Sequence, residues 1–137
     1  MSLQFATLLR NSQLDNIESY GGTNVSLLIY SGLPPAAVED APTGTLLVAI
    51  DLPADWMAAA AAGSKAKSGT WSATAVGTGT AGYFRLCNGS PTDVAFMQGE
   101  IETTGGSPSG VMGLDNTSIS SGQTVTVTTF TLTDNNA

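Results

Sequence analysis

The feature that most constrains this fold is a series of short runs rich in Val, Thr, Leu and Ile, separated by clusters of Gly, Pro and Asn. Side chains on a β-strand alternate between two faces, so such runs predict strands rather than helices. The predicted strands are 24–31, 45–52, 69–76, 81–88, 93–102, 111–115 and 123–133. Short turns between them, without alternating helices, predict an all-β protein: an antiparallel β-sandwich, jelly-roll-like, with a short N-terminal helix.

Two of these strands have informative patterns. Apolar residues occupy both faces of 24–31, which predicts a strand buried on both sides. In the last strand, apolar residues stand at odd positions up to Val127 and at even positions from Phe130. A regular strand cannot send both sets to one face. We therefore expect a β-bulge or a crossing between sheets at Thr128–Thr129, and the alternative is a strand buried on both faces.

Residues 5–20 form the one clear helical pattern. Phe5, Leu8 and Leu9 share a face that predicts docking onto a sheet, Ser2 is a candidate cap, and Gly21 follows the last apolar residue. Residues 54–67 are ambiguous, because five consecutive alanines favour a helix by propensity while an isolated alanine turn buries little. An irregular loop is the alternative for that segment.

The chain length predicts one domain, 1–137, with a helix over 1–22, a sandwich over 23–133 and a tail over 134–137. We expect a surface loop at 36–44 and the most flexible loop at 103–110. Without a signal-peptide pattern or an apolar run of membrane-spanning length, we expect a chain that is made in the cytoplasm and does not enter a membrane.

The composition limits the kinds of partner and of catalytic mechanism that this chain can have. The chain has no histidine, one cysteine, four basic residues and a net charge of −7. Phosphate recognition depends on Lys and Arg clusters, so we predict that nucleic acid is not a partner. The absence of histidine excludes Ser-His-Asp and Cys-His catalysis. Cys87 is expected to be a buried thiol on a strand. Charged residues make up 11% of the chain, well below the roughly 25% that is usual, which suits a surface that meets other protein.

The remaining catalytic and ligand patterns are weak. Lys65 and Lys67 lie beside serines in a Gly/Ala/Ser-rich segment, and Glu100 and Glu102 form a carboxylate pair best explained as a solvated strand end. The oxygen-rich segments 115–117 and 134–136 lack EF-hand spacing, and the glycine-rich segment 77–82 opens no helix. We therefore predict no catalytic residues, no metal, no cofactor and no enzymatic activity.

A few large or charged side chains invite specific expectations. Arg85 is expected to pair with Glu100 or Glu102 on a neighbouring strand. Trp71 and Phe96 are predicted core residues. The adjacent Trp56 and Met57 are interpreted either as a lid over the core or as an anchor into a partner.

The order of these motifs resembles that of small structural proteins encoded in tailed-phage and prophage genomes, a family that includes capsid cement or decoration proteins such as that of the Bordetella phage. The resemblance runs from about Ala6 to Thr133 and rests on turns and strands. The segments that carry it are a short N-terminal helix, 28–34 (LIYSGLP), 43–47 (TGTLL), 79–86 (GTAGYFRL) and 119–125 (ISSGQTV).

The resemblance implies a virion protein on the capsid exterior, made in the bacterial host cytoplasm, with the major capsid protein and a second copy of itself, most simply as a homodimer, as partners. Two other roles stay open: a neck or tail component, and a carbohydrate-binding adhesin module whose Trp56, Trp71 and Tyr83 would line one face. A hydrolase using Glu100 and Glu102 is a third alternative. The candidate partner-contact residues are Leu33, Pro34, Pro35, Trp56 and Met57.

Overall fold

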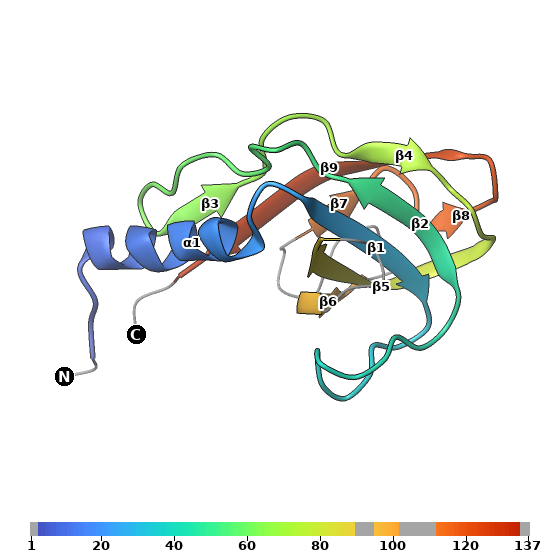
Figure 1. Ribbon diagram of the computed structural model, residues 1–137, viewed down its shortest axis with the longest axis horizontal. Coiled ribbons are helices and arrows are strands. Elements are labelled where there is room, and N and C mark those ends of the chain that lie inside the picture. Colours follow the sequence, from blue (N-terminus) through green and yellow to red (C-terminus); the bar gives the residue numbers. More distant parts are fainter. Residues whose placement is uncertain (1–2, 90–94, 102–111, 135–137) are drawn as a thin grey trace.

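The computed structural model describes residues 3–89, 95–101 and 112–134, and it contains two antiparallel sheets and one N-terminal helix (Figure 1). The predicted all-β sandwich is confirmed, while its jelly-roll character stays a prediction. The elements in chain order are α1 Thr7–Gly21, β1 Val25–Ser31, β2 Leu46–Asp51, β3 Ser64–Ala66, β4 Ser72–Thr74, β5 Gly79–Asn88, β6 Ala95–Glu100, β7 Met112–Leu114, β8 Ser118–Ile119 and β9 Thr124–Thr133.

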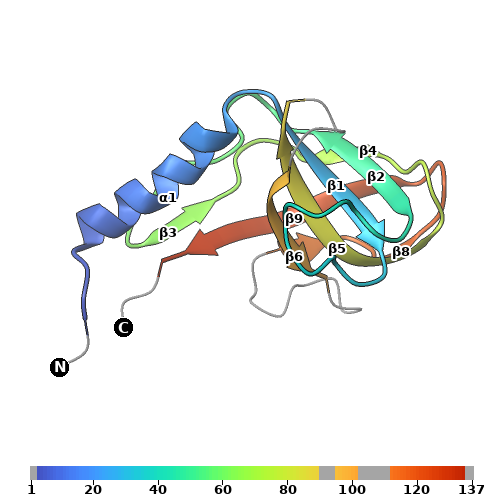
Figure 2. The same ribbon diagram turned by 60° about the horizontal axis from the view of Figure 1, so that its bottom comes forward.

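The first sheet has the order β2-β1-β5-β6, and β8 pairs with the start of β5. The second sheet is built on β9, which pairs with β4 near its start, with β7 in its middle and with β3 near its end. All of these pairs are antiparallel. The ten-residue strand β9 therefore runs from beneath the first sheet to the level of the helix (Figures 1 and 2).

The main core lies between the two sheets and is dominated by aromatic rings. The rings of Trp71 and Phe130 lie 5.1 Å apart, those of Phe84 and Phe130 5.8 Å, and those of Trp56 and Trp71 6.2 Å. Trp71 is buried and Phe96 is partly buried against this cluster, which confirms both as core residues. Such aromatic contacts bury large areas and prefer tilted or edge-to-face geometry.

Strand β1 is buried on both faces, as its sequence predicts. Leu27 and Ile29 point into the main core. Leu28 and Tyr30 belong to a second, smaller cluster on the other face of the sheet, together with Tyr83, Cys87 and Ala95. The expectation of a buried Cys87 on a strand is thereby confirmed.

The predicted bulge in the last strand is confirmed. Gly113 of β7 lies opposite Thr129, and the next residue, Leu114, lies opposite Val127, so Thr128 has no counterpart on β7. The extra residue exchanges the two faces of β9 at this point, so that odd-numbered side chains before it and even-numbered ones after it lie on the same side. Val127 and Phe130, three positions apart, consequently both reach the main core.

Two local predictions are corrected, and the choice between helix and loop that the sequence left open at 54–67 is decided. Residues 54–67 form no helix: Ala62 and Gly63 both have positive φ, 53° and 73°, and lead into β3 through a tight hairpin turn. Gly79 and Thr80, predicted as turn residues, begin β5 and pair with β8, an unpredicted strand. The strand predicted over 69–76 is limited to Ser72–Thr74. Strand pairing with β9 and β5 overrides local propensity in these segments.

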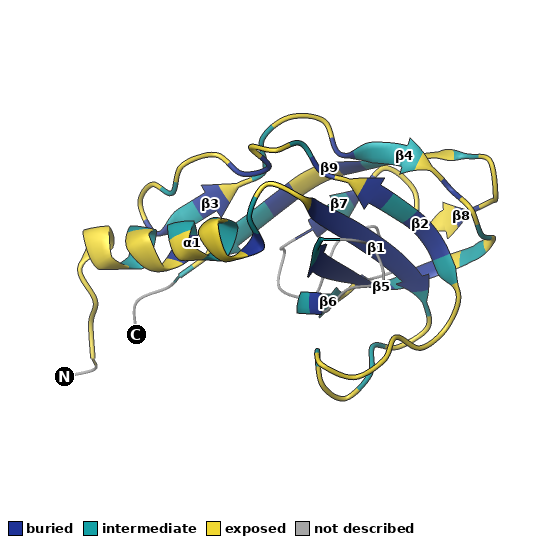
Figure 3. Ribbon diagram, in the orientation of Figure 1, coloured by how far each residue is buried: buried dark blue, intermediate teal, exposed yellow. Residues whose placement is uncertain are grey.

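The helix also departs from its predicted packing. It begins at Thr7 with Ala6 at the N-cap position and no side-chain cap, while Ser2 lies outside the described residues. It lies beside β3 and extends beyond the sandwich (Figure 2). Leu8 and Leu9, expected to face a sheet, are exposed, and Leu14 is the buried leucine of the helix. Much of the surface of α1 is exposed (Figure 3).

A glycine allows β1 and β5 to approach closely where β1 ends. Tyr30 pairs with Tyr83 and Ser31 with Ala81, so the register shifts across Gly82. A Cβ added at Gly82 would lie 1.9 Å from the carbonyl oxygen of Gly32 and 2.7 Å from its nitrogen. Both atoms belong to the backbone, so the strands themselves would have to separate to accommodate a side chain.

We therefore expect Gly82→Ala to lower the free energy of unfolding by about 1–3 kcal/mol, the usual cost of overpacking a well-packed site. Thr80→Ala, on an exposed position of the same strand, is the control and should change it by less than about 0.5 kcal/mol. Urea unfolding measures both variants. Equal stability of Gly82→Ala and the parent chain would contradict the close approach.

Candidate interaction surfaces

A segment that we call the strap, residues 32–45, crosses the outer face of the first sheet between β1 and β2. Val38 of the strap packs against the second apolar cluster, in which the rings of Tyr30 and Tyr83 stack 5.1 Å apart. Burial raises the pKa of Tyr30, with Tyr83 as a second cause. The predicted surface loop is thus also the cover of a small core.

Hydrogen bonds from the sheet hold the strap in place. The Tyr83 hydroxyl donates to the carbonyl of Thr43 at 2.6 Å and accepts from its amide at 2.9 Å. Arg85 donates through Nη2 to the carbonyl oxygens of Val38 and Asp40, and Gln98 donates to that of Pro35 at 3.0 Å. Polar side chains of the sheet therefore satisfy backbone groups of a strap that has no strand partner of its own.

This arrangement corrects the expected pairing of Arg85. Gln98, rather than a glutamate, lies opposite Arg85 on β6, and Glu100 lies opposite Tyr83. Glu102 is outside the described residues. The guanidinium is buried and binds backbone carbonyls of the strap, so its role is to fix a loop.

The predicted partner-contact residues separate into two groups. Leu33, at the start of the strap, has 77% of its surface exposed, and Pro34 and Pro35 are half-buried beside it. Trp56 and Met57 are fully buried in the main core, and the Trp56 indole donates to the carbonyl of Gly22 at 3.0 Å. These two residues form a lid over the core, and the reading of them as an exposed anchor is wrong.

Burial also removes the aromatic surface on which glycan binding was predicted to depend. Trp56, Trp71 and Tyr83 each have 0% of their surface exposed. Sugar recognition by a sandwich requires exposed rings on one face, so these three side chains cannot supply such a platform.

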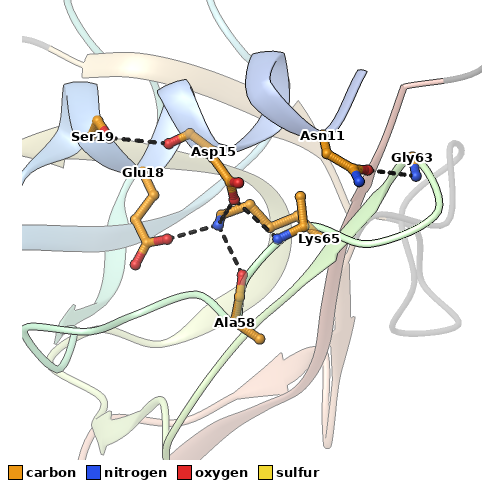
Figure 4. A network of polar contacts seen from close by, with 8 residues as sticks. Asn11, Asp15, Glu18, Ser19, Ala58, Gly63 and Lys65 are labelled. Atoms are coloured by element: carbon orange, nitrogen blue, oxygen red, sulfur yellow. Dashed lines mark hydrogen bonds and ion pairs between the residues drawn. The ribbon is translucent and has the colours of Figure 1, made fainter. Parts of the chain in front are cut away.

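A polar network that the sequence did not predict fixes α1 to the hairpin that contains β3 (Figure 4). Lys65 is 1% exposed, and its ammonium nitrogen lies 2.6 Å from Asp15 Oδ1, 2.7 Å from Glu18 Oε2 and 2.8 Å from the carbonyl oxygen of Ala58. Three acceptors surround the three donors of the ammonium group, so the buried cation is fully paired.

Further hydrogen bonds extend this contact along the helix. The side-chain oxygen of Asn11 accepts from the amide of Gly63 at 2.9 Å, and Asp15 Oδ1 accepts from that of Ala60 at 3.0 Å. Arg10 donates to the carbonyl oxygen of Asp134 at the end of β9, at 3.0 Å. The spacing of Asn11, Asp15 and Glu18 places them on one side of a helix, and that was the available signal in the sequence.

The network sets the protonation of its members. The hydrogen bond from Lys65, followed by that from Ala60, lowers the pKa of Asp15 below its ordinary value of 3.8. Burial by itself would lower the pKa of Lys65, but the hydrogen bonds to Asp15 and Glu18 outweigh it, and the pKa is raised above 10.5. A lysine held as a paired cation is not available as a general base for a neighbouring serine.

The oxygen-rich segment 115–117, considered above as a possible ligand site, binds nearby backbone amides. Asp115 accepts from the amide of Thr126, and Asn116 from that of Ser118. Among residues 3–89, 95–101 and 112–134, no three His, Cys, Asp or Glu side chains converge as metal ligands. Within the same ranges α1 is the sole helix, and its 15 residues do not form a membrane-spanning segment.

One open pocket of about 430 Å³ lies between α1, the strap and β6. The rings of Tyr20 and Phe96 meet edge to face there, 5.7 Å apart, and Glu39 is the one carboxylate among the described residues that line it. The described lining residues therefore do not supply the pair of carboxylates that glycoside hydrolysis uses.

Comparison with known proteins finds no relative: the chain matches no family model, no curated protein and no solved structure. The functional argument therefore depends on the surfaces described above.

The strap yields a first prediction for these surfaces. Tyr83→Phe keeps the stacked ring but removes both hydrogen bonds to Thr43, so we expect a loss of about 1–2 kcal/mol in the free energy of unfolding. Tyr20→Phe, which alters an exposed hydroxyl, is the control. Amide exchange at Thr43 should also accelerate in Tyr83→Phe. Unchanged exchange there would show that the hydroxyl does not hold the strap.

The network yields a second prediction, concerning pH. Because the pKa of Asp15 is lower in the folded protein than its ordinary value, its ion pair stabilises the fold above about pH 4, and that stabilisation disappears as the pH falls through the lowered pKa. The melting temperature of Asp15→Asn should therefore lie below that of the parent chain at neutral pH, and the difference should shrink in acid.

Asp55→Asn, a change of an exposed loop carboxylate, is the matched control and should follow the parent chain across the same pH range. A constant difference between Asp15→Asn and the parent chain from neutral pH to pH 3 would contradict a charge-dependent contact.

Proposed function

We propose that this protein is a structural component of a tailed-phage virion that binds the outside of the icosahedral capsid and bridges subunits of the major capsid protein. It is made in the bacterial cytoplasm and acts without catalysis. The support is physical: a rigid β-sandwich whose large apolar side chains are exposed in separate places, on a chain with few charges.

The observation that carries this proposal is the separation of two exposed apolar surfaces. Leu33 lies on the strap, which begins at the end of β1 that points away from α1 (Figure 1). Leu8 and Leu9 lie on the helix, beyond the other end of the sandwich. A protein that bridges neighbours needs two contact surfaces held at a fixed distance, and the two packed sheets between these sites supply that rigidity.

The strap is the better candidate for the capsid contact. It presents Leu33 beside the two half-buried prolines, and its backbone is fixed by Tyr83, Arg85 and Gln98. A fixed loop loses little conformational entropy on binding, so modest contact areas suffice. Repetition over a shell of identical subunits then multiplies weak contacts.

Co-sedimentation tests the proposal. The purified chain is mixed with empty capsids assembled from the major capsid protein encoded in the same genome. We expect saturation at copy numbers comparable to those of the shell protein, and Leu33→Asp should weaken binding by about tenfold or more, because it places a charge in an apolar contact.

Val76→Asp is the matched control, since Val76 is also an exposed apolar residue but lies in the turn between β4 and β5. It should bind as the parent chain does. Saturation at a handful of copies per particle would indicate a neck or tail component instead, and no binding to capsids would exclude the capsid role.

A further inference from the structure

The N-terminal part of the chain carries an unusual concentration of exposed apolar side chains. Among the described residues, seven large apolar side chains are exposed, and four of them lie between positions 3 and 9. Leu3 is 69% exposed, Leu8 80% and Leu9 48%, with Phe5 at 38%. We call residues 3–14 the arm; it lies at the end of the molecule farthest from the β4–β5 turn (Figure 3).

The arm does not need these side chains to hold its position. A surface helix normally turns its apolar face to the core. Here the contact of α1 with the β3 hairpin is made by Asn11, Asp15 and Glu18, through the network around Lys65 (Figure 4). Leu8 and Leu9 are therefore exposed on a helix that other contacts already fix to the β3 hairpin. Exposed apolar side chains of this kind are expected of a contact surface for another molecule.

The distribution of charge favours a second copy of this chain as the occupant. The protein carries a net charge of −7, so most surfaces of two copies repel each other. Residues 1–14 contain no carboxylate, and their one charged side chain is Arg10, which is bound to Thr7 and to the end of β9. The nearest acid in the sequence, Asp15, is neutralised by Lys65. Two arms can therefore meet without bringing unpaired acidic side chains of these segments together.

We propose that two copies of the protein associate through their arms, with Leu3, Leu8 and Leu9 of each copy packed in a symmetric contact. A two-fold interface uses the same patch on both partners, as this arrangement requires. The strap of each copy would then lie at an outer end of the pair. This last consequence, a unit that reaches two capsid sites at once, rests on the proposed function.

Sedimentation equilibrium of the full chain tests the association. We expect the parent chain to change from 13.9 kDa to twice that mass as its concentration rises. The double variant Leu8→Glu, Leu9→Glu should weaken dimerisation by at least about tenfold while its helix is kept, since glutamate is a good helix former. Leu33→Glu, the same change on the strap, is the matched control and should dimerise as the parent chain does.

Cross-linking provides a second measurement. It detects the formation of a dimer, so a variant that merely folds poorly cannot produce the expected result. Leu8→Cys should form a disulfide-linked dimer under mild oxidation, and Leu33→Cys should not. A parent chain that stays monomeric at about 100 µM, a concentration at which even a weak dimer with micromolar Kd is populated, would overturn the inference. So would unchanged dimerisation of the glutamate variant.

The two proposals fail separately. A monomeric chain that saturates capsids would remove the arm contact and leave the capsid role, whereas a dimer formed through Leu8 that binds no capsid would do the reverse.

Discussion

The pairing of β1 with β5 is the contact on which the rest of the structure depends, because each face of this pair supports a different cluster. One face carries Leu27 and Phe84 into the main core, and the other carries Leu28 and Tyr83 beneath the strap. A strand pair buried on both sides cannot shift its register by one residue without exchanging the two sets. The strap, the outer β6 strand and the second sheet are all positioned by that register.

Several features of the fold follow from the sequence because they depend on local periodicity. The change of parity between Val127 and Phe130 requires an extra residue, and the structure places it at Thr128. Apolar residues on both faces of β1 predict double burial, which is observed. Local propensity left the alanines at 58–62 open between a helix and a loop, because their conformation is set by pairing with the segment that contains β3, which in turn pairs with β9.

The interaction surfaces were less predictable, because they depend on contacts between distant residues. Lys65 meets Asp15 across fifty positions, and Arg85 meets the strap across more than forty. The sequence places Lys65 and Lys67 in a small-residue segment, but it does not indicate which of the two is buried or which residues it contacts. The sequence shows Trp56 as a large apolar residue in a predicted loop. Its burial depends on contacts with Gly22 and Trp71, which no local sequence pattern relates to it.

The length of β9 has a mechanical consequence. The strand pairs with β4 and β7 inside the sandwich and with β3 beside the helix, so one continuous backbone joins the body to the projecting end. A pull on α1 passes along the chain into β1 and, through the Lys65 ion pairs, into β3 and then along β9. Ladder hydrogen bonds run perpendicular to the strands, so tension in this direction shears many of them together instead of opening them one after another. The architecture resists stretching along its longest dimension.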